Sequence, residues 1–303
     1  MSSSGSASAT DSAGVRSAPK SGKSNPGGSG NTDLEEMSAG IPLPPPPRGK
    51  DFPSYEDHRN HIKRHMCAAF RSFARRGFSE GMSGHISVRD PEHQDNFWTN
   101  PLGRHFAMMR PSDLVLVDES GEPIGGNKES PVNAAGFFIH TAVHKARKDV
   151  QAAIHMHSPA GKAFSMFGTK IDMLNQDACI FYGENLGIYE HFGGPVMTEE
   201  EGEKLASNLG KKAIILKNHG LMTVGTTVDE AATLFIYLEQ ACHNQLLVEA
   251  ACAGGSLKKT VIEDKIAEET CKGTIHPDNL YWEFQPEYAY MMQLSGGDFE
   301  RLL

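Results

Sequence analysis

The sequence predicts an α/β fold, because short apolar runs typical of buried strands alternate with segments whose apolar residues repeat at helical spacing. Two strand candidates, 150–157 and 213–217, are short and end in polar or turn residues. Two long amphipathic helices are predicted at 55–76 and 228–253. Gly77 ends the first helix, and the capping box that starts at Thr227 opens the second.

The remaining elements follow from the same signals. Three histidines of the first helix, His58, His61 and His65, lie on or near its polar side and are predicted to be solvated. Strands are expected at 85–89, 97–99, 113–117 and 174–183, and helices at 132–147, 158–166 (with Pro159 at the first helical position) and 198–209 (with a capping box from Thr198 to Glu201).

Composition narrows the class of protein. The chain has 303 residues, of which 39% are hydrophobic, so it can form a sizeable core. The formal net charge of -9 argues against nucleic acid as a partner. The sequence contains no apolar run of about 18 residues, so we expect no membrane span. It also lacks an apolar segment near the N-terminus, so we expect no secretory signal. Five scattered cysteines without a C-x-x-C pair indicate reduced thiols and a cytoplasmic or nuclear location.

Three regions are predicted along the chain. Residues 1–50 are rich in Ser, Gly, Lys and Pro and are expected to be a disordered tail. Its prolines 44–47 favour polyproline II geometry, which serves either as a spacer or as a ligand for a proline-binding module. Residues 51–255 form the folded domain. Residues 256–303 contain enough aromatic and Met residues to dock on this domain or on a neighbouring subunit.

A pair of histidines closes the strand 150–157. Because side chains alternate along a strand, His155 and His157 face the same side. Two neutral imidazoles side by side supply half of a site for Zn²⁺ or Fe²⁺. The alternative is that the two histidines are satisfied by hydrogen bonds within the protein.

A third histidine follows the strand 213–217. Asn218 and Gly220 mark a tight turn that would present the imidazole of His219 from a fixed backbone. Three histidines on two rigid elements are enough for a tetrahedral metal site with an open fourth position. The residues alone do not require His219 to meet the other two.

A resemblance connects these motifs. Together they resemble the metal-binding motifs of the class II aldolase/adducin family, and the likeness covers roughly residues 55–255, closest to adducin heads and stand-alone adducin-like proteins. The motifs stand in the family's order: Gly84-His85-Ile86-Ser87-Val88-Arg89-Asp90, Asn100-Pro101-Leu102-Gly103, Asn133-Ala134-Ala135-Gly136-Phe137, His155-Met156-His157-Ser158-Pro159-Ala160-Gly161 and Lys217-Asn218-His219-Gly220-Leu221.

The resemblance implies a fold, an assembly and a metal. The expected fold is a three-layer α/β/α domain with a largely antiparallel central sheet, assembled into a symmetric homo-oligomer such as a tetramer. His155, His157 and His219 would hold a divalent metal. Zn²⁺ is the first choice, with Fe²⁺ or Mn²⁺ as alternatives.

The chain departs from the sugar-phosphate aldolases of the family at two places. The family's metal-binding, proton-transferring glutamate falls on Gly136, which has no side chain to do either. In the glycine turn that helps to hold the phosphate, this chain has Met82, which offers no donor to an anion, and His85. A sugar-phosphate aldolase activity therefore does not transfer directly.

Other polar residues are candidates for the substrate pocket. His85, Gln176 and Tyr182 are predicted to bind substrate, with a structural turn histidine, a strand cap and a core-edge tyrosine as the alternatives. Asp177 is the first choice for a replacement base. His140 is the second candidate for a catalytic group. It lies one turn before His144 on the predicted helix 132–147, and this pair either binds a metal itself or lines the rim of the core, with His140 next to the metal site.

Three functions fit the sequence. The leading hypothesis is a metal-dependent lyase that performs aldol cleavage or decarboxylation on a small non-phosphorylated carbonyl or carboxylate compound. The second is an adducin-like oligomerisation module associated with actin; the negative charge of the chain opposes it, because adducin-type actin binding depends on a strongly basic tail. The third is an Fe²⁺-dependent oxygenase, because an iron ion held by three histidines would keep open coordination positions.

Overall fold

The fold is built on an eight-stranded sheet. In the computed structural model, which describes residues 43–194, 196 and 198–299, the strand order is β4-β3-β2-β1-β5-β8-β7-β6. Every neighbouring pair is antiparallel except β6 and β7. The strands are β1 (His85–Arg89), β2 (Phe97–Thr99), β3 (Val115–Val117), β4 (Pro123–Gly126), β5 (Ala152–Met156), β6 (Leu186–Tyr189), β7 (Ala213–Leu216) and β8 (Gly220–Gly225). The predicted α/β fold with a largely antiparallel sheet is confirmed.

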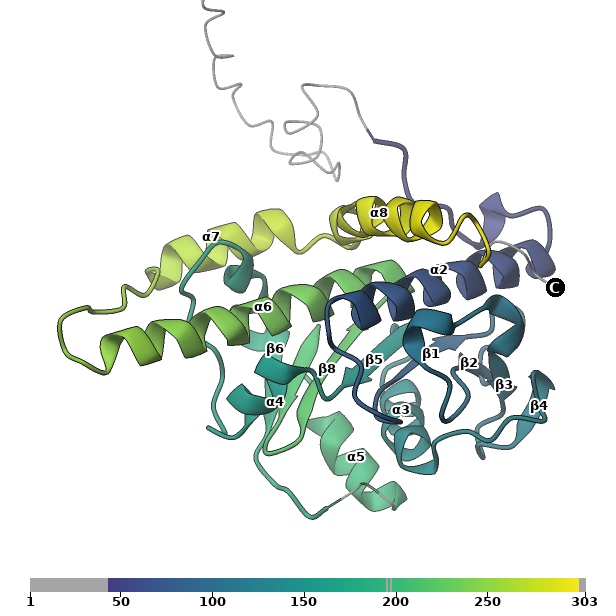
Figure 1. The fold of residues 1–303 in the computed structure, drawn as a ribbon, viewed down its shortest axis with the longest axis horizontal. Helices are drawn as coiled ribbons and strands as arrows, with labels where there is room; N and C mark the ends of the chain where they lie inside the picture. Colours follow the sequence, from purple (N-terminus) through teal and green to yellow (C-terminus); the bar gives the residue numbers. More distant parts are fainter. Residues whose placement is uncertain (1–42, 195, 197, 300–303) are drawn as a thin grey trace, which may run out of the picture. The chain divides into compact units, whose positions relative to one another are not determined.

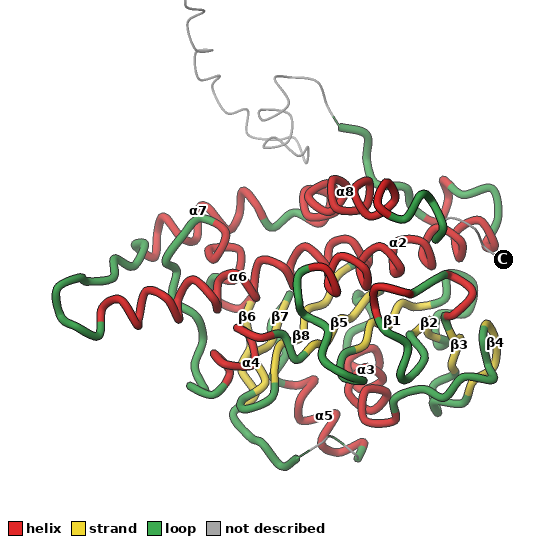
Figure 2. The backbone as a smooth tube through the Cα atoms, viewed as in Figure 1, coloured by secondary structure: helices red, strands yellow, loops and turns green. Residues whose placement is uncertain are grey.

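Helices cover both faces of this sheet (Figures 1 and 2). Alternating side chains of β5 divide the core: Ile154 and Met156 pack with α2, α4 and α6, whereas Ala153 packs with α3 and α5. The helices are α2 (Tyr55–Arg75), α3 (Ala134–Ala146), α4 (Pro159–Ser165), α5 (Glu199–Ser207), α6 (Val228–Cys252), α7 (Asp264–Thr274) and α8 (Pro277–Leu294). The three predicted layers are therefore present, and the bounds of the two long helices agree with the sequence to within a residue or two.

The helix α8 lies outside these three layers, packed on α6 and α2 (Figure 1). It also contacts the segment before α2, where the Trp282 indole N–H donates to the Pro44 carbonyl at 2.9 Å. The larger part of the predicted tail, residues 1–42, falls outside the described residues. All five cysteines are free thiols. Among the described residues, no helix combines the length and apolar character that crossing a membrane requires.

The outer helix explains why one expectation about α2 is wrong. His65 is buried rather than solvated: its Nδ1 lies 2.6 Å from a carboxylate oxygen of Asp229, and its ring stacks on Tyr288 of α8 at 4.2 Å between centroids. At His65 the polar side of α2 is thus an interface with α6 and α8, which the spacing within α2 alone could not reveal.

The predicted strand at 174–183 is also wrong. The segment forms a 3-10 helix, Asp177–Phe181, whose first turn is held by a hydrogen bond from the Ala178 amide to the Asn175 side chain at 2.8 Å. Its apolar residues Ala178 to Phe181 are all buried, and they pack near α6 and α7 instead of pairing with a strand. An apolar run of this length fits a buried helical turn as well as a strand. Conversely, β4 and β6 were not expected from the sequence.

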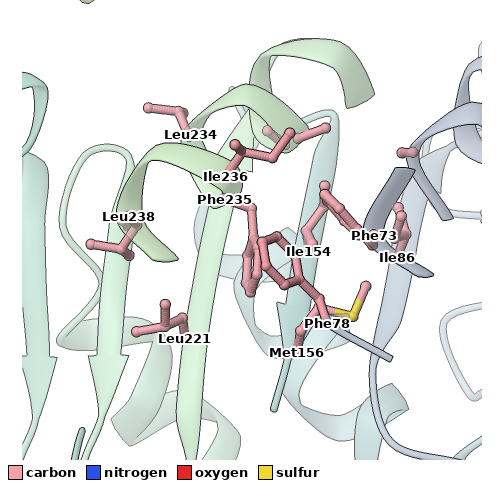
Figure 3. Close-up of a cluster of buried hydrophobic side chains, with 14 of the residues drawn as sticks. Phe73, Phe78, Ile86, Ile154, Met156, Leu221, Leu234, Phe235, Ile236 and Leu238 are labelled. Carbon is pink, nitrogen blue, oxygen red and sulfur yellow. The ribbon is translucent and has the colours of Figure 1, made fainter. Parts of the chain in front are cut away.

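An aromatic cluster fixes α6 on the sheet (Figure 3). The Phe235 ring lies 5.4 Å from Phe73 of α2 and 5.9 Å from Phe78, and all three side chains are buried. We expect Phe235→Ala to lower the free energy of unfolding by about 3–5 kcal/mol, because it removes a large buried ring and leaves a cavity. Chemical denaturation measures the change. Leu247→Ala is the control, since Leu247 lies on the same helix and is 57% exposed; an equal loss in both variants would contradict the assignment of this core.

Candidate metal centre

Three imidazoles converge at one end of the sheet. His155 is the second-to-last residue of β5, before Met156. His157 directly follows this strand, and His219 lies in the turn between β7 and β8. One ring nitrogen from each lies within 4.8 Å of the others. The ring centroids are 4.7–5.1 Å apart, and the rings are nearly perpendicular to one another. The structure therefore brings together the three residues that the sequence singled out as metal ligands.

The tautomer of His155 is set by the backbone of the neighbouring strand. Its Nδ1 lies 2.9 Å from the Leu221 carbonyl oxygen, and since a carbonyl can only accept, Nδ1 carries the proton. The other nitrogen, Nε2, is then free to bind a metal. Metal-bound histidines commonly donate their second ring N–H to a carbonyl or carboxylate in this way.

The short helix α4 connects His157 with the turn that carries His219. It begins directly after His157, and at its end Ser165 accepts hydrogen bonds from the turn that carries His219. The Asn218 amide donates to the Ser165 carbonyl, and the His219 amide donates to the Ser165 hydroxyl, both at 3.2 Å. Asn218 has a left-handed backbone with φ of 56°, a conformation that Asn tolerates better than most residues. These bonds fix His219 relative to His157.

A buried carboxylate holds the start of α4. Glu239 of α6 accepts from the amides of Ala160 at 2.8 Å and Gly161 at 2.6 Å, and from the Ser158 hydroxyl. It thereby satisfies helix N-terminal donors that would otherwise be unpaired. Because Ser158 follows His157, this contact also orients the second imidazole.

The electrostatics of the cluster suit a metal ligand set. Burial, followed by the neighbouring histidines, holds the pKa of His155 well below its usual range. Burial is also the main cause that lowers the pKa of His157 and that lowers the pKa of His219 to about 4. All three rings are therefore neutral near pH 7, and neutral imidazole is the form that binds Zn²⁺ and similar ions. The residues present fit a divalent metal.

A cavity of about 300 Å³ opens over the three histidines. Lys162 of α4 lines it and forms an ion pair with Glu80 at 2.6 Å. Phe192 lines another part of the wall and is 50% exposed, with its ring 6.3 Å from that of His219. Sequence reasoning missed both residues. Lys162 could have been found, because it stands five residues after His157 at the start of a predicted helix.

His85 lies beside the cluster and against Gly136. Its ring centroid is 5.0 Å from that of His155, its partner in the pairing of β1 with β5, and its Nδ1 is 2.9 Å from Nε2 of His140. A Cβ added at Gly136 would lie 2.5 Å from Nε2 of His85, far inside contact distance. The ring of His85 thus fills the space that a side chain at residue 136 would need.

The remaining predicted site residues lie elsewhere. Gln176 and Asp177 are exposed at the start of the 3-10 helix, and Tyr182 packs against the main core near Asp264 of α7. Within the described part of the chain, none of the three lines the cavity over the histidines. The structure does not bring them to the metal cluster of the same chain.

Two further histidines lie buried behind His85. His140 and His144 of α3 both hydrogen-bond to the Ser87 hydroxyl of β1. Burial is the main cause that lowers the pKa of each to about 3, so both are neutral at pH 7. A histidine that stays neutral in the folded state, but has a pKa near 6.5 when unfolded, stabilises the fold fully above pH 6.5 and progressively less as the pH falls toward 3.

The chain's similarity to known proteins agrees with this geometry. Residues 64–246 match the family model described as Class II Aldolase and Adducin N-terminal domain. The chain belongs to the class II aldolase/adducin family. Relatives include the Meiotically up-regulated gene 14 protein of Schizosaccharomyces pombe (strain 972 / ATCC 24843), 43% identical over 82% of this chain and 97% of the relative.

Two relatives from Streptomyces carry names that describe a reaction. Decarboxylase NovR of Streptomyces niveus is 47% identical over 66% of this chain and 74% of its own. The 4-hydroxy-3-prenylphenylpyruvate oxygenase/4-hydroxy-3-prenylbenzoate synthase of Streptomyces roseochromogenus subsp. oscitans is 46% identical over 66% of this chain and 72% of the relative. Among solved structures, L-fuculose 1-phosphate aldolase from Glaciozyma antarctica PI12 superposes with a TM-score of 0.76, at 41% identity over 84% of this chain and 97% of the other.

The close approach of the His85 ring to Gly136 predicts that replacing this glycine by alanine lowers the stability of the protein. Gly→Ala within a helix normally stabilises by about 0.5–1 kcal/mol. We expect Gly136→Ala instead to destabilise the protein by about 1–3 kcal/mol, because the new methyl group meets the His85 ring. In a His85→Ala background the same substitution should be neutral or stabilising. Urea denaturation of the four proteins measures this coupling, and additive effects would contradict the close contact.

The buried histidines predict a pH effect on stability. Between pH 7 and pH 5 the free energy of unfolding should fall, since the unfolded chain takes up protons that His144 in the folded chain does not. One such histidine accounts for about 2 kcal/mol of the lost free energy of unfolding at pH 5. We expect His144→Gln to reduce the loss by about this amount, as measured by denaturation at both pH values. Leu247→Ala, which changes an exposed position on α6 without removing a titratable group, should leave the pH dependence unchanged.

Proposed function

We propose that the chain is a divalent-metal-dependent enzyme of the lyase type that acts on a small non-phosphorylated carbonyl or carboxylate compound by aldol cleavage or decarboxylation. The observation that carries this proposal is the convergence of three neutral imidazoles beside a cavity of about 300 Å³. His155, His157 and His219 would hold Zn²⁺, or alternatively Fe²⁺ or Mn²⁺. Such an ion supplies a Lewis acid that polarises a substrate oxygen.

The other groups of the cavity would bind and orient the substrate. The Lys162 ammonium supplies a positive charge for a substrate carboxylate, and its contact with Glu80 holds it in place. The ring of Phe192 offers an apolar surface at the mouth. His85 places a buried imidazole next to the metal cluster. Because Gly136 has no side chain, the proton transfers of the reaction must use a group other than residue 136.

The lining of the cavity favours a carboxylate over a phosphate ester. Lys162 is the one cationic side chain that lines it within the described residues, and Glu80 already neutralises part of its charge. A phosphate dianion usually requires several cations and N–H donors. At the glycine turn, Met82 is 64% exposed and offers no donor. The relatives named for a decarboxylase and for a phenylpyruvate compound support the same choice.

A second candidate is an Fe²⁺-dependent oxygenase. One similar relative is named for an oxygenase reaction on 4-hydroxy-3-prenylphenylpyruvate, and three histidine ligands leave open positions on an iron ion. Loading with Fe²⁺ and measuring oxygen consumption with aromatic oxo-acids distinguishes this candidate from the lyase. Association with actin and assembly into a homo-tetramer rest on the family resemblance alone. Co-sedimentation with filaments and light scattering after gel filtration test these two properties.

The metal assignment predicts the effect of removing one ligand. Wild-type protein purified without chelators should contain about one divalent metal ion per chain. We expect His157→Ala to lose this metal almost completely, because two imidazoles cannot hold the ion against dilution. Elemental analysis measures the content. His243→Ala, at an exposed site on α6, serves as the control and should keep its metal. Full metal content in His157→Ala would rule out the assignment.

The substrate assignment is tested by a direct comparison. Metal-loaded protein should convert an arylpyruvate or a hydroxy-aldehyde, and this activity should disappear in His157→Ala. L-fuculose 1-phosphate, named for the similar solved structure, belongs in the same assay. Turnover of the sugar phosphate alone would contradict the non-phosphorylated substrate class.

A further inference from the structure

A row of hydrogen-bonded side chains runs from the backbone of one strand to the wall of the cavity. Nδ1 of His144 lies 3.4 Å from the Val150 carbonyl oxygen, and its Nε2 lies 2.8 Å from the Ser87 hydroxyl. The same hydroxyl contacts Nδ1 of His140, whose Nε2 is 2.9 Å from Nδ1 of His85. All four side chains are at most 7% exposed, so bulk water has little access to these hydrogen bonds.

The carbonyl at one end sets the direction of every bond in the row. A carbonyl only accepts, so the proton of neutral His144 stands on Nδ1, and its Nε2 must accept from the Ser87 hydroxyl. That hydroxyl has a single hydrogen, so it accepts from Nδ1–H of His140. Nε2 of His140 then accepts from Nδ1–H of His85. Nε2 of His85 is consequently left with a lone pair and no hydrogen.

The edge of the ring that carries this nitrogen faces Gly136, on the wall of the cavity over the three histidines. His85 and Gly136 both line that cavity, and Nε2 is the ring atom that, together with Cδ2, stands closest to the open side of Gly136. The ring lies next to His155. Among the described residues, no protein donor to Nε2 of His85 is present. A molecule bound in the cavity can supply this donor.

We propose that the row from Val150 to His85 makes His85 a fixed hydrogen-bond acceptor, which selects substrates that carry a hydroxyl group next to the oxygen facing the three histidines. This inference rests on the proposed function for the metal. The chemical class is that of 2-hydroxy acids, hydroxy-ketones or the enol form of oxo-acids. His85 contacts the substrate, whereas Ser87, His140 and His144 are positioning residues that act through it. A site built to receive an O–H rejects the matching ether, because its buried acceptor is then left unpaired.

The first test measures the tautomers without a metal or a substrate. Long-range ¹H–¹⁵N correlation spectra of metal-free protein with ¹⁵N-labelled histidine report which nitrogen carries each proton. We expect Nδ1–H for His85, His140 and His144. Ser87→Ala should disturb the tautomers of His140 and His85, and Ser87→Thr should restore them because it keeps the hydroxyl. A proton on Nε2 of His85 in the wild type, or unchanged spectra in Ser87→Ala, would overturn the inference.

The second test measures selection by the zinc-loaded protein. Calorimetry compares glycolate, which has the hydroxyl, with methoxyacetate, which lacks it. We expect glycolate to bind about tenfold more tightly to the wild type and to Ser87→Thr, and this preference to fall to within about twofold in Ser87→Ala and His85→Phe. An undiminished preference in His85→Phe would overturn the inference while leaving the metal site intact. If the protein binds none of Zn²⁺, Fe²⁺ and Mn²⁺, the proposed function is overturned instead, and the tautomer measurement alone then tests the inference.

Discussion

The register of β5 against its two neighbours is the constraint on which the site depends. It places His155 opposite His85 of β1 and next to the start of β8, whose Leu221 carbonyl fixes the tautomer of the ring. Because side chains alternate along a strand, a slip of one residue would turn His155 away from the cavity and into the core under α6. The buried apolar residues Ile154 and Met156 oppose such a slip, since they would exchange faces with the histidine. Core packing and site geometry are thus set by the same register.

The helix α4 extends this constraint to the third imidazole. Its start is held by Glu239 of α6, and its end is bonded to the turn of His219 through Ser165. Hydrogen bonds within the protein therefore position the ring of His155 and the backbone that carries His157 and His219. A site that is already assembled loses less entropy when it binds an ion or a substrate.

The sequence predicted the parts of the fold that local signals determine. The helices with capping residues, the strand that carries His155 and the turn at Asn218 all form where expected. Features that depend on partners distant in sequence were not predictable: His65 is buried by α8, and the segment after Asn175 becomes a 3-10 helix because it packs between helices. The family resemblance, rather than the spacing of residues, connected His219 with the other two histidines.

The close contact between Gly136 and His85 is another feature that the sequence alone could not predict. From the sequence, Gly136 is only the loss of a glutamate. In the structure, the missing side chain leaves the space that the ring of His85 occupies, and the row behind His85 determines which of its nitrogens carries a proton. Asp177, chosen from the sequence as the replacement base, is exposed and lines no part of the cavity over the histidines. The absence of a side chain at one position therefore makes room for a ring from another element.

The central claim is that one divalent ion is bound by the three imidazoles of His155, His157 and His219. X-ray absorption spectroscopy of the zinc-loaded protein measures its ligand shell most directly. We expect three imidazole nitrogens at about 2.0–2.1 Å, completed by oxygen from water or substrate, with no sulfur ligand. A shell that contains cysteine sulfur, or fewer than three imidazoles, would contradict it.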